Sequence, residues 1–222
     1  MTTMKLNDQD LAENSHSRLP VCIVLDTSGS MEGTPINELN EGVKVFVNEL
    51  LEDELARYVA DVAIITFGGN VQKKMDFSNV SNETTIDCIA DGGTPMGEAI
   101  EYSLDLLDKR KKEYESNGTE SYQPWMCIMS DGQPTDSIEE AVVRTSEMVK
   151  AGKLTIFPVA IGPEADIHLL NRISPKMTAL RLEGLKFKEF FEWLSGSVKK
   201  VSESMPGEEV DLPQPTWAKV SI

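Results

Sequence analysis

The sequence predicts an α/β fold with a doubly wound, mostly parallel sheet, one antiparallel edge strand and helices on both faces. Short apolar runs alternate along the chain with longer segments whose apolar residues recur every three or four positions. The runs are too short for helices and rich in β-branched residues, which is typical of strands buried on both faces. Strands that alternate with amphipathic helices indicate a parallel sheet covered on both sides.

The first predicted strand covers residues 21–25 and is an unbroken apolar run. It stops at Asp26, where small polar residues and a glycine allow the chain to turn. Thr34 and Pro35 resemble an N-cap followed by a first-turn proline. Apolar residues then recur at helical spacing as far as Leu51, so this helix should pack on the sheet.

The second predicted strand covers residues 59–67, and two glycines end it. Residues 71–77 alternate only roughly between apolar and polar side chains. They include Lys73 and Lys74, and charged residues on an edge strand discourage pairing with another molecule. We therefore expect this segment to be the edge strand of the sheet.

A glycine-rich loop at residues 91–97 leads into the next predicted helix. Residues 110–123 are charged and polar, which indicates a solvated helix end and a loop. The strand predicted at residues 125–129 is buried and ends at Ser130-Asp131-Gly132. Its polar end is the second place where a strand runs directly into an acidic turn.

Asp136 and Glu139 have the spacing of a capping box for the helix that follows. Strands are then predicted at residues 154–161 and 178–182, on either side of a short helix around Ile167–Ile173. A last amphipathic helix is predicted at residues 186–201, with Phe187, Phe190, Phe191, Leu194, Val198 and Val201 on one face.

We expect one domain at residues 19–202, a flexible N-terminal arm at residues 1–18 and an extended, proline-rich tail at residues 203–222. The net charge of -16 would repel nucleic acid and anionic membranes. No stretch is apolar enough to span a bilayer, and residues 1–18 lack the apolar core of a secretory signal. We therefore expect no nucleic acid or membrane partner and a cytoplasmic location.

Oxygen-bearing side chains lie in three loops that a doubly wound sheet would bring to one edge. Asp26, Ser28 and Ser30 follow the first strand, Thr94 precedes a helix, and Asp131 follows a later strand. The carboxyl ends of such strands face a common crevice where ligands bind. Two carboxylates and three hydroxyls suit a small octahedral cation that keeps several waters. Each residue also fits an ordinary turn or helix cap, so the residues alone leave both interpretations open.

Enzymatic function is disfavoured by the residues that are missing. Phosphatases that form an acyl phosphate use the motif Asp-x-Asp, and Ser28 stands in this chain where that motif has its second Asp. A Ser-His-acid hydrolase needs a histidine, and the two histidines, His16 and His168, are expected on the surface. The chain has no Gly-x-x-x-x-Gly-Lys phosphate loop. We expect a protein that is not an enzyme, with a metal-dependent phosphatase-like hydrolase as the least favoured alternative.

Residues 26–30, read as Asp-Thr-Ser-Gly-Ser, followed by Thr94 and Asp131-Gly132, resemble the metal-ion-dependent adhesion site (MIDAS) of von Willebrand factor type A (VWA) domains. The resemblance runs from residue 20 to about residue 200 and implies a Rossmann-like VWA fold. It implies that Ser28 and Ser30 contact Mg²⁺ directly, and that Asp26 and Asp131 act mainly through bound water. Thr94 would move in or out of the coordination sphere.

The same resemblance implies a protein partner whose Asp or Glu side chain completes the octahedron. Neutral hydroxyls leave the ion's charge poorly compensated, so the site could attract an acidic group despite the negative chain. Mn²⁺ would substitute for Mg²⁺, and Ca²⁺ would fit less well. The alternative is a structural subunit or scaffold in which the metal stabilises the fold and engages no ligand.

Four further stretches resemble a narrower bacterial group, the short TerY/YegL-like proteins associated with tellurium resistance and stress. They are residues 38–42, 92–100, 130–136 and 190–195. This resemblance implies a cytoplasmic stress or tellurium-resistance complex. Ser130 departs from the wider VWA pattern rather than from that of this group, because many VWA relatives have Thr there, and it is not an expected ligand.

Overall fold

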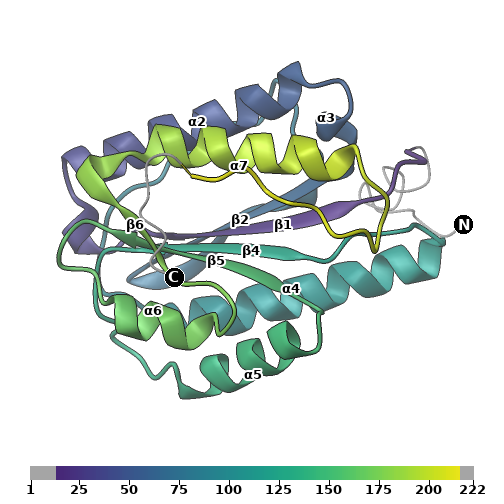
Figure 1. Ribbon diagram of the computed structural model, residues 1–222. Coiled ribbons are helices and arrows are strands. Elements are labelled where there is room, and N and C mark those ends of the chain that lie inside the picture. The colour runs from purple at the N-terminus through teal and green to yellow at the C-terminus, as the bar shows by residue number, and fades with distance from the viewer. Residues whose placement is uncertain (1–13, 216–222) are drawn as a thin grey trace, which may run out of the picture.

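Six strands form one sheet in the order β3-β2-β1-β4-β5-β6 in a computed structural model that describes residues 14–215 (Figure 1). The strands are β1 (Leu19–Asp26), β2 (Ala60–Gly68), β3 (Asn70–Ser78), β4 (Trp125–Ser130), β5 (Thr155–Ile161) and β6 (Leu180–Leu182). Every neighbouring pair is parallel except β2 and β3, which are antiparallel. The predicted fold class is confirmed, with β3 as the antiparallel edge strand.

Helices cover both faces of the sheet (Figure 1). They are α2 (Thr34–Glu52), α3 (Ala56–Val59), α4 (Met96–Asn117), α5 (Glu139–Lys150), α6 (Ile167–Ile173) and α7 (Phe187–Ser202), with 3₁₀ turns η1 (Gly29–Met31) and η2 (Glu183–Leu185). Helices α2 and α7 lie side by side on one face, and α4, α5 and α6 lie on the other. The strand order reverses between β1 and β4, and the crevice beyond such a reversal is where doubly wound folds bind ligands.

Strand β1 is buried along its whole length and contributes to both apolar layers. Val21, Ile23 and Leu25 belong to the layer under α2 and α7. Cys22 and Val24 point the other way, into the layer under α4, α5 and α6. Alternate side chains of a strand face opposite sides, so a strand in mid-sheet needs apolar residues throughout.

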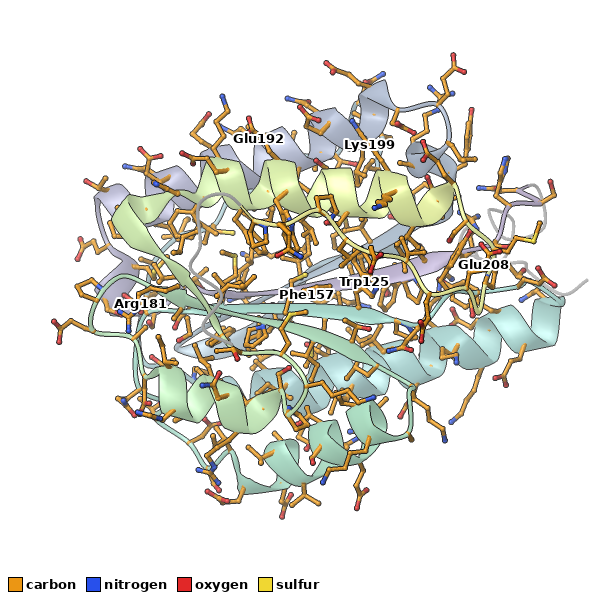
Figure 2. The ribbon with its side chains drawn as sticks, in the orientation of Figure 1. Trp125, Phe157, Arg181, Glu192, Lys199 and Glu208 are labelled. Atoms are coloured by element: carbon orange, nitrogen blue, oxygen red, sulfur yellow. The ribbon has the colours of Figure 1, made fainter. Side chains whose placement is uncertain are left out.

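Helix α7 packs closely on α2 because α2 has a glycine at the contact. A Cβ atom on Gly42 would lie 2.7 Å from the ring of Phe191 and 3.0 Å from Cβ of Phe187. Below α7, the Trp125 and Phe157 rings pack edge to face with centroids 5.1 Å apart (Figure 2). This aromatic contact continues to Trp193 of α7 and fixes the helix over the middle of the sheet.

The N-cap predicted at Thr34 is wrong. Thr34 is the first residue of α2, and its N-cap is Gly33, with no capping hydrogen bond from a side chain. Gly33 has a φ of 87°, a conformation that favours glycine over residues with a Cβ atom. The turn out of η1 therefore sets where α2 begins.

The solvated helix end predicted at residues 110–123 is also wrong in its first part. Helix α4 continues to Asn117, and Arg110 and Tyr114 are buried against Asp61 of β2. Nε of Arg110 donates to Oδ2 of Asp61 at 2.6 Å, and the Tyr114 hydroxyl donates to the same oxygen. Asp61 lies near the amino end of β2. This polar cluster is therefore at the end of the sheet opposite the carboxyl ends of β1 and β4.

The segment after α7 packs on the domain as far as the structure describes it. Leu212 is half-buried against the apolar layer under α7, and Nε1 of Trp193 donates to the carbonyl oxygen of Pro213 at 2.7 Å. The Tyr122 hydroxyl donates to the carbonyl oxygen of Ser204 at 2.6 Å. Trp217, which also belongs to the predicted tail, lies outside the described residues.

Candidate functional site

The first part of the candidate site is the turn from β1 into η1. Asp26 is the last residue of β1, and its Oδ1 accepts a hydrogen bond from the backbone N–H of Ser28 at 2.9 Å. This bond turns the chain sharply after the strand and brings the serines beside the carboxylate. Oγ of Ser28 then lies 3.0 Å from Oγ of Ser30, so the two hydroxyls share a hydrogen bond.

The turn after β4 joins the same cluster. Oγ of Ser30 donates to Oδ1 of Asp131 at 2.8 Å, although the two residues are 101 positions apart. Because β1 and β4 are adjacent parallel strands, their carboxyl ends lie side by side and bring the two turns together.

Thr94 comes from the loop before α4. A Cβ atom on Gly132 would lie 3.8 Å from Oγ of Ser30 and 3.8 Å from Oγ1 of Thr94. The N–H of Gly29 also donates to the carbonyl oxygen of Gly92 at 2.9 Å, which holds the Thr94 loop against η1. The structure therefore brings all three predicted loops to one edge of the sheet.

Burial divides the cluster into an inner and an outer part. Asp26 is fully buried, and Ser28 and Thr94 are almost so. Burial raises the pKa of the Asp26 carboxyl, while hydrogen bonds from Ser130 and Ser28 act against that rise. Ser30 is exposed and Asp131 is half-exposed, so an incoming group would reach the cluster from their side.

Ser130 contributes to the site although the sequence did not indicate it. Its hydroxyl donates to Oδ2 of Asp26 at 2.5 Å, so both oxygens of that buried carboxylate accept hydrogen bonds. The sequence shows Ser130 only as the end of a strand, and its partner is 104 positions away.

The capping box predicted for α5 is wrong, because Asp136 caps a different helix. Its carboxylate accepts hydrogen bonds from the backbone N–H groups of Gly97 and Glu98, in the first turn of α4. The residue before α5, Ile138, makes no side-chain capping bond. A carboxylate just ahead of a helix fits that helix equally well, so the local pattern could not reveal its true partner.

The donor set can hold a hard cation. Hydroxyl and carboxylate oxygens are the ligands that Mg²⁺, Mn²⁺ and Ca²⁺ accept, and a site with two carboxylates leaves room for water. Within residues 14–215, no group of three or more His, Cys, Asp or Glu side chains is arranged to hold a metal. The hydroxyls of Ser28, Ser30 and Thr94 would therefore have to supply part of any coordination at this edge.

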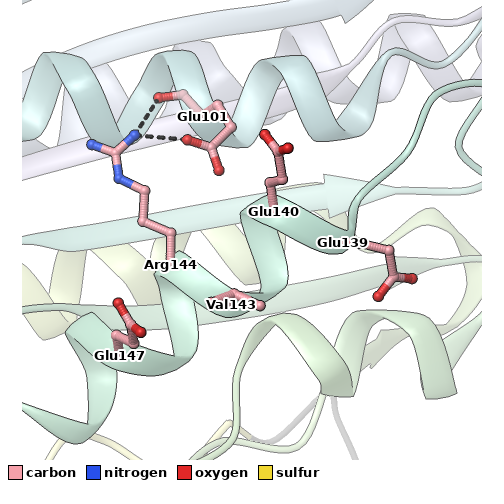
Figure 3. Close-up of a pocket in the computed structure, with 6 residues that line it drawn as sticks. All are labelled: Glu101, Glu139, Glu140, Val143, Arg144 and Glu147. Carbon is pink, nitrogen blue, oxygen red and sulfur yellow. Dashed lines mark hydrogen bonds and ion pairs between the residues drawn. The ribbon is translucent and has the colours of Figure 1, made fainter.

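A separate hollow lies between α4 and α5 (Figure 3). It is lined by Glu101, Glu139, Glu140, Val143, Arg144 and Glu147. Arg144 donates to Glu101 at 2.7 Å across this hollow. No residue of the predicted site lines it, and its walls come from helices rather than from the carboxyl ends of strands.

Comparison with known families settles the fold family. The model of the von Willebrand factor type A domain matches residues 21–190. The chain belongs to the VWA domain family. VWA domains commonly serve as protein-interaction modules.

Two relatives show how widely this VWA domain's sequence is shared. It is 26% identical over 161 residues to the inter-alpha-trypsin inhibitor heavy chain H6 of Homo sapiens, covering 69% of this chain and 12% of that one. It is 22% identical over 170 residues to an uncharacterised protein of Synechocystis, covering 73% of this chain and 37% of that one. The chain thus spans well under half of these curated relatives.

Solved structures share the fold at low sequence identity. The pilus adhesin SpaC from Lactobacillus rhamnosus GG, in an open conformation, has a TM-score of 0.64 at 14% identity, covering 85% of this chain and 31% of that one. Proximal thread matrix protein 1 from the mussel byssus has a TM-score of 0.58 at 15% identity, covering 83% and 48%. Zinc occupies the MIDAS motif in that mussel structure. In residues 14–215 of the VWA chain, no helix is long and apolar enough to cross a membrane.

Proposed function

We propose that this VWA domain binds a protein partner through one Mg²⁺ ion held by Asp26, Ser28, Ser30, Thr94 and Asp131. The observation that carries the proposal is the hydrogen-bonded chain Ser28–Ser30–Asp131, which joins two distant turns through side-chain oxygens alone. The three side chains bond directly to one another. Oxygens that converge in this way are the groups that a hard cation would draw to itself.

The charges of the five residues explain why an acidic partner would be recognised. Two carboxylates can at most balance a divalent ion, and Asp26 is held deep below the surface by Ser130 and the Ser28 backbone. The outer side of the site is formed by the neutral Ser30 and by Asp131. A bound divalent ion would supply local positive charge and an open coordination position there, which suits a carboxylate.

The chain's remaining features fit a binding module better than an enzyme, and we propose no catalytic role. The resemblance to TerY/YegL-like proteins leads us to propose a cytoplasmic bacterial stress or tellurium-resistance complex as the setting. We also propose the domain limits of residues 19–202, with the arm and tail outside them.

The alternative function is a metal that only stabilises the fold. It predicts metal-dependent stability without metal-dependent binding.

An array of immobilised peptides tests the proposal. Each acetylated and amidated peptide carries one Asp or Glu, and its matched peptide carries Asn or Gln at that position. We expect the protein to bind a subset of the acidic peptides in Mg²⁺ and to release them in EDTA. It should not bind the matched Asn or Gln peptides. Asp26→Ala is the control and should bind none of them. Capture that survives EDTA, or that treats acid and amide alike, would contradict the proposal.

A further inference from the structure

Thr135 and Asp136 tie the loop that carries Asp131 to the loop that carries Thr94. The N–H of Thr94 donates to Oγ1 of Thr135 at 3.0 Å, and the N–H of Thr135 donates to the carbonyl oxygen of Thr94 at 2.9 Å. These reciprocal bonds fix the backbone of Thr94 on both sides. The two peptide groups that flank Thr94 set the direction of its side chain, and both are therefore held by the loop that carries Asp131.

Asp136 adds a second connection between the same two segments. Its Oδ1 accepts from the N–H of Gly97 at 3.0 Å, and its Oδ2 accepts from the N–H of Glu98 at 2.8 Å. Helix N-termini have N–H groups without intrahelical partners, and a carboxylate there is favoured by hydrogen bonding and by the helix dipole. The start of α4, which directly follows Thr94, is thus capped from the Asp131 loop.

Glycines let the two backbones approach closely enough for these bonds. A Cβ atom on Gly93 would lie 3.1 Å from Oγ1 of Thr135. A Cβ atom on Gly97 would lie only 2.1 Å from the carbonyl oxygen of Ser137, which is closer than atoms can approach. The glycines of this loop therefore allow a tight contact between the two backbones.

We propose that Thr135 and Asp136 are positioning residues that make Thr94 and Asp131 one pre-organised half of the metal site. This inference rests on the proposed function, because it assumes that the five residues hold an ion. Neither Thr135 nor Asp136 needs to contact the ion. Groups that orient metal ligands commonly change metal affinity by about 10- to 100-fold when they are removed.

A metal titration of matched variants tests the inference, with Mn²⁺ alone as the probe. Asp136→Ala removes two hydrogen bonds to a helix start, and Thr135→Val removes the hydroxyl that accepts from Thr94. Asp53→Ala is the matched control, since Asp53 accepts from Leu55 and Ala56 at the start of α3. Helix α3 lies at the end of the sheet opposite the candidate metal site (Figure 1).

We expect Asp136→Ala and Thr135→Val to weaken Mn²⁺ binding by about tenfold or more. Thr135→Ser keeps the hydroxyl and should stay within about threefold of the unaltered protein, as should Asp53→Ala. If Asp136→Ala fails to fold, Thr135→Val against Thr135→Ser decides alone. The inference fails if Asp136→Ala and Thr135→Val both bind Mn²⁺ normally, or if Asp53→Ala loses as much affinity. If the unaltered protein binds no Mn²⁺, the proposed function fails first.

Discussion

The hydroxyl of Ser130 donates a hydrogen bond to Oδ2 of Asp26 at 2.5 Å, in the buried part of the candidate site. Ser130→Ala would leave that oxygen without its donor in a place that water does not reach. An unsatisfied buried acceptor costs about 1–3 kcal/mol of unfolding free energy. We expect a loss of that size in urea denaturation with EDTA present.

Ser130→Thr is the control, since it keeps a hydroxyl at this position. It should unfold within about 0.5 kcal/mol of the unaltered protein. If Ser130→Ala is equally stable, the hydrogen bond to Asp26 does not hold the carboxylate in place.

The buried ion pair at the opposite end of the sheet gives a second prediction. Arg110 is 2% exposed and Asp61 is fully buried, so Arg110→Met would remove the cation that donates a hydrogen bond to this buried carboxylate. Breaking a buried pair in this way costs about 3–5 kcal/mol. Arg172→Met is the control, because Arg172 and Glu139 form an exposed pair whose loss should have little effect on stability. Similar losses for the two variants in urea denaturation would contradict the burial of Arg110.

The three cysteines are expected to be inert in the native protein. Burial raises the pKa of the Cys22 thiol to about 12 and that of Cys88 to about 11, and it raises the pKa of Cys127 well above its usual value. At pH 8, only about one Cys88 thiol in a thousand would be ionised. A chromogenic disulfide reagent should therefore titrate the thiols in urea and almost none in native buffer. Rapid reaction of a native thiol would contradict the predicted burial.

The same thiols make stability fall at alkaline pH. Their folded pKa values lie above the unfolded value of about 9, so the folded state holds its protons longer. The contribution is complete below pH 9 and is lost as the pH rises toward 11–12. At pH 10 each such thiol should lower the unfolding free energy by about 1.4 kcal/mol relative to low pH. Cys22→Ala should flatten the pH dependence, and an unchanged slope would contradict this assignment.

The segment after α7 gives a further prediction. Leu212 is half-buried on the apolar layer, whereas Met205 is 71% exposed. Leu212→Asp should lower the unfolding free energy by about 1–2 kcal/mol, and Met205→Asp should have little effect. Limited proteolysis should cut the Leu212→Asp protein faster near residue 205. Rapid removal of everything after Met205 with no change in melting temperature would reject the docking of this segment.

The sequence predicted the strands and the three site loops because both depend on local pattern. Apolar runs and helical spacing give the order of the elements, and parallel pairing then brings Asp26 and Asp131 to one edge. It could not predict the contacts that support them. Asp136 and Gly97 are 39 positions apart, and Arg110 and Asp61 are 49 apart. Asp136 also fits a cap for the helix that follows it, and Arg110 also fits a solvated surface charge. Pattern alone therefore gave each of the two residues the wrong role.

Calorimetric titration of EDTA-treated protein with Mg²⁺ and Mn²⁺ tests the central claim most directly. We expect one site per chain, with Mn²⁺ binding at least as tightly as Mg²⁺ because both accept an octahedral oxygen site. The Ser28→Ala/Asp131→Ala double variant, which removes a hydroxyl from the turn after β1 and a carboxylate from the turn after β4, should lose this binding. Unchanged metal binding by the double variant would contradict the assignment of the site.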